Sequence, residues 1–407
     1  MKIHPQKIRA RISLLTVALL IVGVRAQAAD QPTLKKAYQD DFLVGVAINR
    51  TIATDTAVRA DNVNRNTDEV RKDTAVARNQ FNQISPENDL KWQLIHPREG
   101  ADGYNFAPAD AYVEFGLSNN MYIVGHTLVW HSQTPNWVFA GTNPPPAANT
   151  NAPVRGFGRF GYNGPRASRE ELLARMRDHI HTVVGRYKGK IKTWDVVNEA
   201  LADGGTNVLR NSLWLEIIGP DFIAKAFEYA HEADPDAILR YNDYGLENPA
   251  KRRKLIELVK SLQAQKVPVM AIGSQAHLNV STSFEVMDQA LTEIATLGLP
   301  IHITELDVNG AQGGQRNTSG DVASNASATQ GGLVSDADKK LADAYAGLFR
   351  AFLKHKDSVK VVTFWGVNDG VSWRANGKPL LFDRNNQPKP AFDAVIRVAG
   401  EAKSKVE

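Results

Sequence analysis

The sequence contains no cysteine among its 407 residues, which excludes disulfide bonds. The folded state must therefore be stabilised by a hydrophobic core, and 43% hydrophobic residues are ample for one. The sequence also has no internal repeat and no Pro/Ser/Thr-rich linker that would lead to a separate binding module. We therefore expect a single domain after the N-terminal segment.

A long apolar run is lacking near the N-terminus, where one would mark a membrane anchor. The apolar stretch at residues 12–24 is shorter than the roughly 20 residues that a membrane-spanning helix needs. Four basic residues precede it, Lys2, Lys7, Arg9 and Arg11, and the small-x-small sequence Ala-Gln-Ala follows at residues 26–28. This pattern predicts a secretory signal peptide at residues 1–28 and a mature domain at residues 29–407. We expect a protein secreted to the periplasm or the medium, with no membrane contact after cleavage.

Net charge is also small once this segment is removed. The full chain carries +4, but residues 1–28 contain five Lys or Arg and no Asp or Glu, so the remaining chain carries −1. The basic balance thus belongs to the export signal, and we infer no nucleic-acid or anionic-membrane partner from it.

Short β-like runs alternate with helical patterns along the mature chain, which predicts a parallel α/β fold. Eight runs read as buried strands: residues 42–48, 81–85, 121–126, 192–198, 237–242, 269–274, 301–305 and 359–365. Eight such strands fit a closed (β/α)8 TIM barrel. Extended loops follow strand three, at residues 141–167, and strand seven, at residues 310–334. Both lie on the active-site face of a barrel, as lids or surface insertions, and the second has no aromatic residue, which favours an insertion.

Helical periodicity fills the intervals between the strands. Apolar residues recur at positions 172, 173, 176, 180, 183, 184 and 187, and at 255, 258, 259 and 262. Each set marks one buried helix face. Ser168 and Glu171 have the spacing of a capping box, and Pro108 and Pro249 suit a first helical turn.

Two of the predicted strands end in glutamate. Residues 192–199 read KTWDVVNE and residues 299–307 read LPIHITELD, so Glu199 and Glu305 follow apolar runs on strands four and seven. The carboxyl ends of barrel strands meet at one mouth. Cleavage of a glycosidic bond needs a proton for the leaving oxygen and a negative group near the oxocarbenium-like carbon. A lone strand-end glutamate is more often a surface residue, but the pair predicts glycoside hydrolysis.

Polar residues on strands six and seven are suited to assist this pair. Alternation along an extended chain predicts that Gln275 and His277 lie on the same side. His277 can hydrogen-bond a carboxylate and hold its charge and orientation. The same alternation places His302 on the face opposite Glu305, which suits a structural histidine of the barrel interior.

Further polar groups and flat aromatic rings follow the other strands, as binding of a sugar chain requires. They are Glu87, Asn88, Asp89, Lys91 and Trp92 after strand two, His126, Trp130 and His131 around the end of strand three, Tyr241, Asn242, Asp243 and Tyr244 at strand five, and Trp365 and Trp373 at and beyond strand eight. A single Trp is more often a core residue. Seven Trp, several just beyond predicted strands, indicate a carbohydrate groove.

Five motifs together resemble family 10 of the glycoside hydrolases, the endo-β-1,4-xylanases. They are SPENDLKW at residues 85–92, GHTLVWH at 125–131, WDVVNE at 194–199, QAH at 275–277 and ITELD at 303–307. They occur in the family's order and span nearly the whole mature chain. The resemblance implies a retaining endo-1,4-β-xylanase that cuts internal bonds of xylan or xylo-oligosaccharides through a covalent glycosyl-enzyme. We expect a monomer, and nothing in the sequence requires a cofactor or a metal.

The resemblance also implies a role for individual residues. Glu199 would be the acid/base and Glu305 the nucleophile. Asn198 would bind the sugar 2-hydroxyl, and His277 would steady the nucleophile with Asp307 behind it. The implied substrate-binding positions are Glu87, Asn88, Lys91, His126 and Trp130 on the glycone side and Trp365 and Trp373 at the cleavage subsite, with Gln275, Asn242 and Tyr244 as further supporting or binding positions. The long loops leave substrate length and xylan decoration open.

For the chemistry, Glu199 must hold a proton while Glu305 stays ionised. We expect their mutual charge and partial desolvation of Glu199 to separate the two pKa values.

Three rival functions remain on the sequence alone: a β-1,4-glucanase or cellulase of similar fold, a metal-dependent barrel hydrolase, and a noncatalytic sugar-binding protein. The metal-dependent hydrolase has little support because no H-E-x-x-H motif is present.

Overall fold

Eight parallel strands form a closed sheet in the computed structural model, which describes residues 32–57, 65–143, 162–310 and 335–404. They are β1 Leu43–Ile48, β2 Gln83–Pro86, β3 Tyr122–Trp130, β5 Thr193–Asn198, β6 Ile238–Asp243, β7 Ala271–Ser274, β9 Ile301–Asn309 and β10 Val359–Phe364. Each overlaps one predicted strand, in the same order. Strand β10 pairs with both β9 and β1, so the sheet has no free edge and the predicted (β/α)8 barrel is confirmed.

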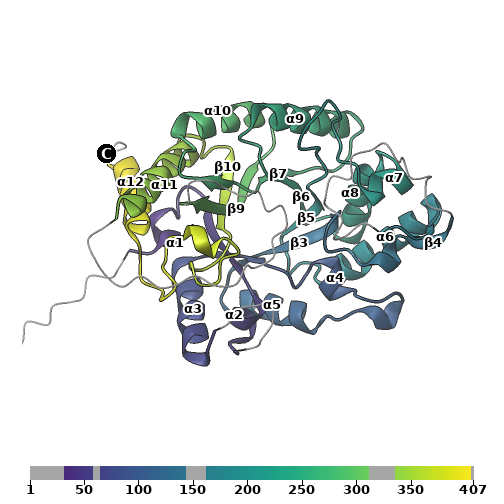
Figure 1. Ribbon diagram of the computed structural model, residues 1–407, viewed down its shortest axis with the longest axis horizontal. Coiled ribbons are helices and arrows are strands. Elements are labelled where there is room, and N and C mark those ends of the chain that lie inside the picture. The colour runs from purple at the N-terminus through teal and green to yellow at the C-terminus, as the bar shows by residue number, and fades with distance from the viewer. Residues whose placement is uncertain (1–31, 58–64, 144–161, 311–334, 405–407) are drawn as a thin grey trace, which may run out of the picture. The chain divides into compact units, whose positions relative to one another are not determined.

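Helices connect the strands and cover the outside of this barrel (Figure 1). They are α1 Leu34–Ala37, α2 Arg50–Thr54, α3 Thr67–Gln80, α4 Trp92–Ile95, α5 Ala107–Ser118, α6 Arg169–Arg186, α7 Leu213–Ile218, α8 Phe222–Ala233, α9 Pro249–Ala264, α10 Phe284–Ala295, α11 Asp336–Lys354 and α12 Pro390–Lys403. Three short 3-10 turns occupy Ala101–Gly103, Asn136–Val138 and Ala375–Gly377. Figure 1 shows α9 and α10 on one side of the strands and α3 and α5 on the other.

Local sequence sets where these helices begin. The predicted capping box of α6 is present, with the Ser168 hydroxyl accepting from the Glu171 amide and the Glu171 carboxylate accepting from the Ser168 amide. Pro108 and Pro249 lie in the first turns of α5 and α9, as predicted. The predicted apolar face of α9 is buried throughout. Helix starts and faces were therefore readable from short-range pattern.

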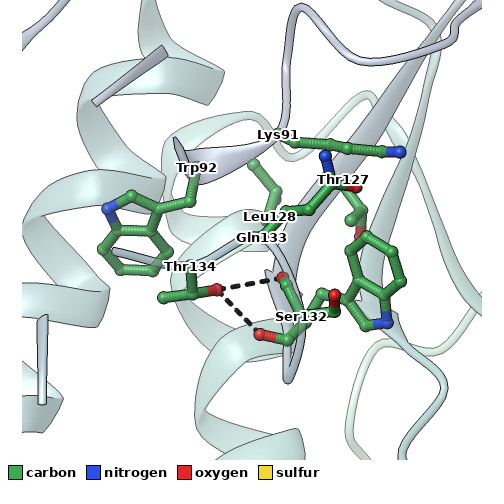
Figure 2. Close-up of a pocket in the computed structure, with 8 residues that line it drawn as sticks. Lys91, Trp92, Thr127, Leu128, Ser132, Gln133 and Thr134 are labelled. Atoms are coloured by element: carbon green, nitrogen blue, oxygen red, sulfur yellow. Dashed lines mark hydrogen bonds between the residues drawn. The ribbon is translucent and has the colours of Figure 1, made fainter. Parts of the chain in front are cut away.

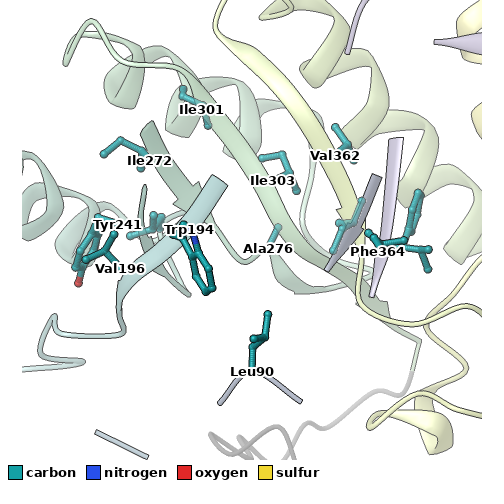
Figure 3. Close-up of a cluster of buried hydrophobic side chains, with 14 of the residues drawn as sticks. Leu90, Trp194, Val196, Tyr241, Ile272, Ala276, Ile301, Ile303, Val362 and Phe364 are labelled. Atoms are coloured by element: carbon teal, nitrogen blue, oxygen red, sulfur yellow. The ribbon is translucent and has the colours of Figure 1, made fainter. Parts of the chain in front are cut away.

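The apolar core fills the space between the strands and the helices. Figure 3 shows part of it, with Trp194 and Val196 on β5, Ile272 on β7, Ile301 and Ile303 on β9, and Val362 and Phe364 on β10. Trp194 lies over Gly125 of the neighbouring strand β3, where an added Cβ atom would overlap the indole ring. The glycine of the GHTLVWH motif thus makes room for a buried tryptophan.

Two strands extend beyond their predicted ends. Strand β3 continues past His126 to Trp130 after a register shift against β5, and β9 continues past Glu305 to Asn309. The extension of β9 has a partner that sequence did not reveal, the short strand β8 at His277–Asn279. A second short strand, β4 at Ala140–Asn143, lies in the loop after β3. Irregular pairing of this kind is common beside active sites.

The prediction that His302 and Glu305 point to opposite faces is wrong. His302 Nδ1 lies 2.9 Å from Arg240 Nη1, and Glu305 Oε1 lies 2.8 Å from Asn242 Nδ2, so both reach the same side of β6. The reason is a bulge, since Ile303 pairs with Val362 whereas Leu306 pairs with Phe364. One extra residue in β9 reverses the alternation. The structural role predicted for His302 agrees with its contact to Arg240.

Some of the sequence predictions concern segments outside the described residues. The predicted signal peptide at residues 1–28 lies there, as do residues 144–161 and 311–334 of the two predicted extended loops. The helices that the structure describes include none with the length and apolar character to cross a membrane.

We expect Gly125→Ala to destabilise the protein by about 1–3 kcal/mol, because the added methyl group must displace Trp194 from a packed core. Urea unfolding followed by tryptophan fluorescence measures the change. The matched control is Gly185→Ala in α6, where a Cβ atom meets nothing within 4 Å. This control should be neutral or more stable by up to about 1 kcal/mol. Equal stability of Gly125→Ala and the native protein would contradict the packing argument.

Candidate active site

Glu199 follows the last residue of β5 and is buried, with 5% of its surface exposed. Its backbone has a φ of 57°, in the left-handed region that residues other than glycine seldom adopt. The carboxylate accepts hydrogen bonds from Trp130 Nε1 at 3.0 Å and from Gln275 Nε2 at 3.0 Å. Donors from β3 and from the end of β7 thus fix both oxygens of Glu199.

Glu305 lies within β9 and is equally buried. One carboxylate oxygen accepts from Asn242 Nδ2 at 2.8 Å, and the other lies 3.1 Å from His277 Nε2. His277 Nδ1 in turn lies 3.0 Å from Asp307 Oδ2. The imidazole of His277 therefore bridges two carboxylates, as expected from the sequence.

Three amide side chains connect the two glutamates. Gln275 Nε2 lies within hydrogen-bond distance of Glu199 and of Asn198 Oδ1, and Asn242 Nδ2 lies within hydrogen-bond distance of Glu305 and of the same Asn198 oxygen. The series Glu199, Gln275, Asn198, Asn242, Glu305 is thus continuous. Because every member holds its neighbours, the two carboxylates have fixed orientations at the same end of the barrel.

Asp307 anchors the far side of His277. It is fully buried and accepts hydrogen bonds from Trp373 Nε1 at 2.8 Å and from Arg374 Nη1 at 3.0 Å. Trp365 and Trp373 stand edge-on to the His277 ring, with ring centroids 6.5 Å and 5.0 Å away. The predicted tryptophan pair therefore lies beside the histidine that supports Glu305.

The residues predicted to bind the glycone side lie around Trp130. Lys91 Nζ donates to Asn88 Oδ1 at 2.8 Å and lies 5.1 Å from the centroid of the Trp130 ring. Glu87 is buried on the same stretch. His126 lies edge-on to Trp365, 5.4 Å between centroids, with its Nδ1 3.0 Å from Asp195 Oδ2.

A small pocket lies beside this group (Figure 2). Its lining consists of Lys91, Trp92, Thr127, Leu128, Trp130, Ser132, Gln133 and Thr134. Figure 2 shows Lys91 and Trp92 directed to opposite sides. Trp92 stacks on His179 with ring centroids 3.7 Å apart, so it is a core residue and not the groove residue that the sequence suggested.

Tyr244 lies on the Glu199 side of the site. Arg210 links the two residues, since its Nε donates to the Glu199 carbonyl at 3.1 Å and its Nη2 donates to the Tyr244 hydroxyl at 2.7 Å. The Tyr244 hydroxyl also donates to Asp203. The sequence reasoning did not identify Arg210 or Asp203, because no strand end or motif marks them.

A buried ion pair below the site was also missed. Arg240 donates two hydrogen bonds to Asp195, at 2.6 Å and 2.9 Å, and Asp195 in turn holds His126. The pKa of Asp195 is lowered to about 2, since burial opposes ionisation but the Arg240 charge and the His126 and Arg240 hydrogen bonds outweigh it. The sequence did carry a signal for this ion pair, because Asp195 and Arg240 are charged residues inside two predicted strands.

The described residues include no group of three or more His, Asp or Glu side chains that could hold a metal ion.

Comparison with known proteins assigns the chain to a family. The profile of glycosyl hydrolase family 10 matches residues 33–398. The chain belongs to glycosyl hydrolase family 10. The family resemblance predicted from the five motifs is confirmed.

Individual known proteins are similar along most of the chain. The β-1,4-xylanase of Dictyoglomus thermophilum is 36% identical over 94% of this chain and 96% of its own length. The endo-1,4-β-xylanase A of a Caldicellulosiruptor strain is 39% identical over 90% of this chain, which spans only 47% of that longer protein. The solved structure of a GH10 endoxylanase from a sugarcane soil metagenome is 37% identical, covers 90% of this chain and 99% of its own, and has a TM-score of 0.74.

In this family 10 protein the two glutamates have opposite pKa shifts. Burial raises the pKa of Glu199, and the negative charges of Asp243 and Glu305 raise it further. Burial also acts to raise the pKa of Glu305, but the His277 hydrogen bond, the charges of His126 and His277 and the Asn242 hydrogen bond lower it below its usual value. Both causes expected from the sequence, burial and the charge of Glu305, raise the pKa of Glu199. The charge of Asp243 is a third cause, which the sequence did not reveal.

We expect His277 to titrate at a pKa of about 9, above its ordinary value of 6.5. Burial lowers this pKa, but the charge and hydrogen bond of Asp307 and the hydrogen bond and charge of Glu305 raise it more. The interaction of charged His277 with Asp307 and Glu305 therefore contributes its full stabilisation of the fold below about pH 6.5. This stabilisation is lost as the pH rises toward 9.

NMR of 15N-histidine-labelled protein measures this titration. His302 is the internal control, because its burial and the Arg240 charge lower its pKa to about 3, so it should stay neutral throughout the neutral range. A His277 signal that titrates near pH 6.5 would contradict the assignment of a charged imidazolium between two carboxylates.

Proposed function

We propose that this family 10 protein is a retaining endo-1,4-β-xylanase that hydrolyses internal bonds of xylan. The observation that carries the proposal is the pair of buried glutamates whose pKa values shift in opposite directions within one hydrogen-bonded series. A retaining glycosidase needs one carboxylic acid and one carboxylate at the same bond. The similarity to proteins that are named xylanases supports xylan as the substrate.

In the first step Glu305 attacks the anomeric carbon while Glu199 protonates the leaving glycosidic oxygen. The bond between the anomeric carbon and that oxygen breaks, and an ester between Glu305 and the sugar forms. Each Glu305 oxygen accepts one protein hydrogen bond, from Asn242 or His277, which leaves lone pairs for the attack. The charged His277 keeps the attacking group ionised until it reacts.

In the second step Glu199 acts as a base. Formation of the ester removes the negative charge of Glu305, so the pKa of Glu199 falls and the residue can accept a proton from water. The water oxygen bonds to the anomeric carbon as the ester bond to Glu305 breaks. This step releases the sugar and restores the Glu305 carboxylate. One residue therefore serves as acid and then as base because its neighbour changes charge.

The remaining side chains position the sugar. We assign Asn198 to the sugar 2-hydroxyl, because its side-chain oxygen already accepts from Asn242 and Gln275, which leaves the amide nitrogen to donate. Trp365 and Trp373 lie beside His277. We assign them to the position where glucose carries a hydroxymethyl group that xylose lacks, so that their rings would exclude glucose. Glu87, Asn88, Lys91, His126 and Trp130 are assigned to the glycone side and Tyr244 to the Glu199 side.

We further propose that residues 1–28 export the protein and that the mature enzyme is a monomer without a metal or cofactor. The basic, apolar and small-x-small order of the N-terminal sequence supports export. The buried series of side chains supports chemistry by carboxyl groups alone.

The substrate and stereochemistry are tested together with purified protein treated with a chelator. We expect faster release of reducing sugar from xylan than from carboxymethyl-cellulose, and proton NMR should show the β-anomer of the first product. Each of the two displacements inverts the configuration of the anomeric carbon, so the product retains the β-configuration of the substrate. Faster cleavage of the cellulose derivative, an α-configured first product, or loss of activity on chelation would each refute part of the proposal.

The roles of the two glutamates are tested by single substitutions. Glu305→Ala should abolish hydrolysis of every substrate, because no nucleophile remains. Glu199→Ala should lower kcat on xylan by about 10²–10⁴-fold, spare an aryl xyloside with a good leaving group, and be partly rescued by azide. Glu257→Ala, at an exposed position of α9, is the matched control. Equal losses on both substrates without azide rescue would overturn the assignment of acid and nucleophile.

A further inference from the structure

Asp243, the last residue of β6, is a buried carboxylate outside the series that joins the two glutamates. Its Oδ1 lies 2.9 Å from Lys251 Nζ and accepts from the Tyr244 amide at 2.9 Å. Its Oδ2 accepts from the Tyr241 hydroxyl at 2.7 Å and from the Leu201 amide at 3.2 Å. Four donors thus converge on one fully buried side chain.

Two of these contacts hold the turn that carries Glu199. Leu201 donates to Asp243 directly, and Ala200 donates to the Tyr241 hydroxyl, at 3.1 Å, which itself donates to Asp243. Ala200 and Leu201 are the two residues after Glu199, whose backbone is in the left-handed region. The fixed amides therefore maintain an unusual backbone conformation that aims the Glu199 carboxyl group.

The charge of Asp243 is only partly offset by its cation. Lys251 Nζ also lies 3.0 Å from Asp203 Oδ1 and 3.3 Å from the centroid of the Tyr244 ring, so one ammonium serves two carboxylates. Glu305 on β9, Arg210 after β5 and Tyr244 after β6 are the other titratable or charged groups that interact with Glu199. His277 on β8 and Asp203 after β5 lie one contact further away, at Glu305 and at Tyr244. Asp243 and Glu305 are the two negative groups that favour the protonated form of Glu199.

We propose that Asp243 is a positioning residue for the acid/base Glu199: it holds the turn that aims Glu199 and supplies a buried negative charge that favours its protonated form, while Lys251 limits that charge. The inference rests on the proposed role of Glu199 and adds residues that determine when Glu199 can act. Burial is the first cause of the raised pKa of Glu199 and the charge of Asp243 is the second, which agrees with this arrangement.

The two parts of the proposal are separated by three substitutions. Lys251→Met removes the cation and leaves the other three donors to Asp243 in place, Asp243→Asn removes the negative charge, and Tyr241→Phe removes hydrogen bonds with no change of charge. Lys260→Met, at an exposed position of the same helix α9, is the matched control for loss of a lysine.

The measurement is the pH dependence of kcat/KM on xylan, whose basic limb reports the pKa of the acid in the free enzyme. Loss of a positive charge raises that pKa, so Lys251→Met should move the basic limb to higher pH by about 0.5–1 unit, and Asp243→Asn should move it by about 0.5–1 unit to lower pH. Tyr241→Phe should lower kcat with no shift of the limb, and Lys260→Met should match the native profile.

A purely structural role for Asp243 would lower activity without moving the limb in opposite directions in the two charge variants. Shifts of the same sign, or no shift in the variants that fold, would overturn the inference, and Tyr241→Phe with full activity would overturn the part on the turn. Glu199→Gln separates this from failure of the function itself. If Glu199→Gln retains the basic limb, Glu199 is not the acid; if it loses the limb while the Asp243 and Lys251 variants keep it unmoved, only the present inference fails.

Discussion

The burial of two neighbouring carboxylates is the constraint on which the site depends. Glu199 and Glu305 are each 5% exposed, and each raises the free energy of ionising the other. Both could not remain charged without nearby cations. The structure resolves this asymmetrically: Glu305 faces the imidazolium of His277, whereas Glu199 faces the additional negative charge of Asp243. In the proposed mechanism, the different environments, and not the residue type, make one glutamate the acid and the other the nucleophile.

Neutral amides link these charged groups without disturbing them. Gln275, Asn198 and Asn242 contribute donors and acceptors but no charge, so they orient both carboxylates while the charged residues set the two pKa values. Behind them, Asp307 holds His277, with Trp373 and Arg374 holding Asp307 in turn. Support of this kind fixes the groups to which the proposed mechanism assigns both steps, since each of these side chains is held by a buried partner.

Much of the site was predictable because its residues directly follow strongly apolar strands. Glu199 and Glu305 were found this way, and the capping box at Ser168 and the face of α9 were found from short-range periodicity. The predictions were wrong where contacts between residues distant in the sequence overrode a pattern of neighbouring residues. The bulge in β9 placed His302 and Glu305 on one side, and the stack on His179 made Trp92 a core residue. Trp130, expected only at the sugar, also donates to Glu199.

The sequence by itself determined the eight strands, their order, the helices between them and the two strand-end glutamates, because these depend on composition and spacing within about ten residues. The motifs pointed to His277 beside Glu305, but only the tertiary structure revealed the groups around Glu199, among them Asp243 and Trp130. Asp243 follows Glu199 by 44 positions and His277 precedes Glu305 by 28, and closure of the barrel brings each to its partner. A pKa depends on distance in space and on exclusion of water, and a one-dimensional pattern records neither.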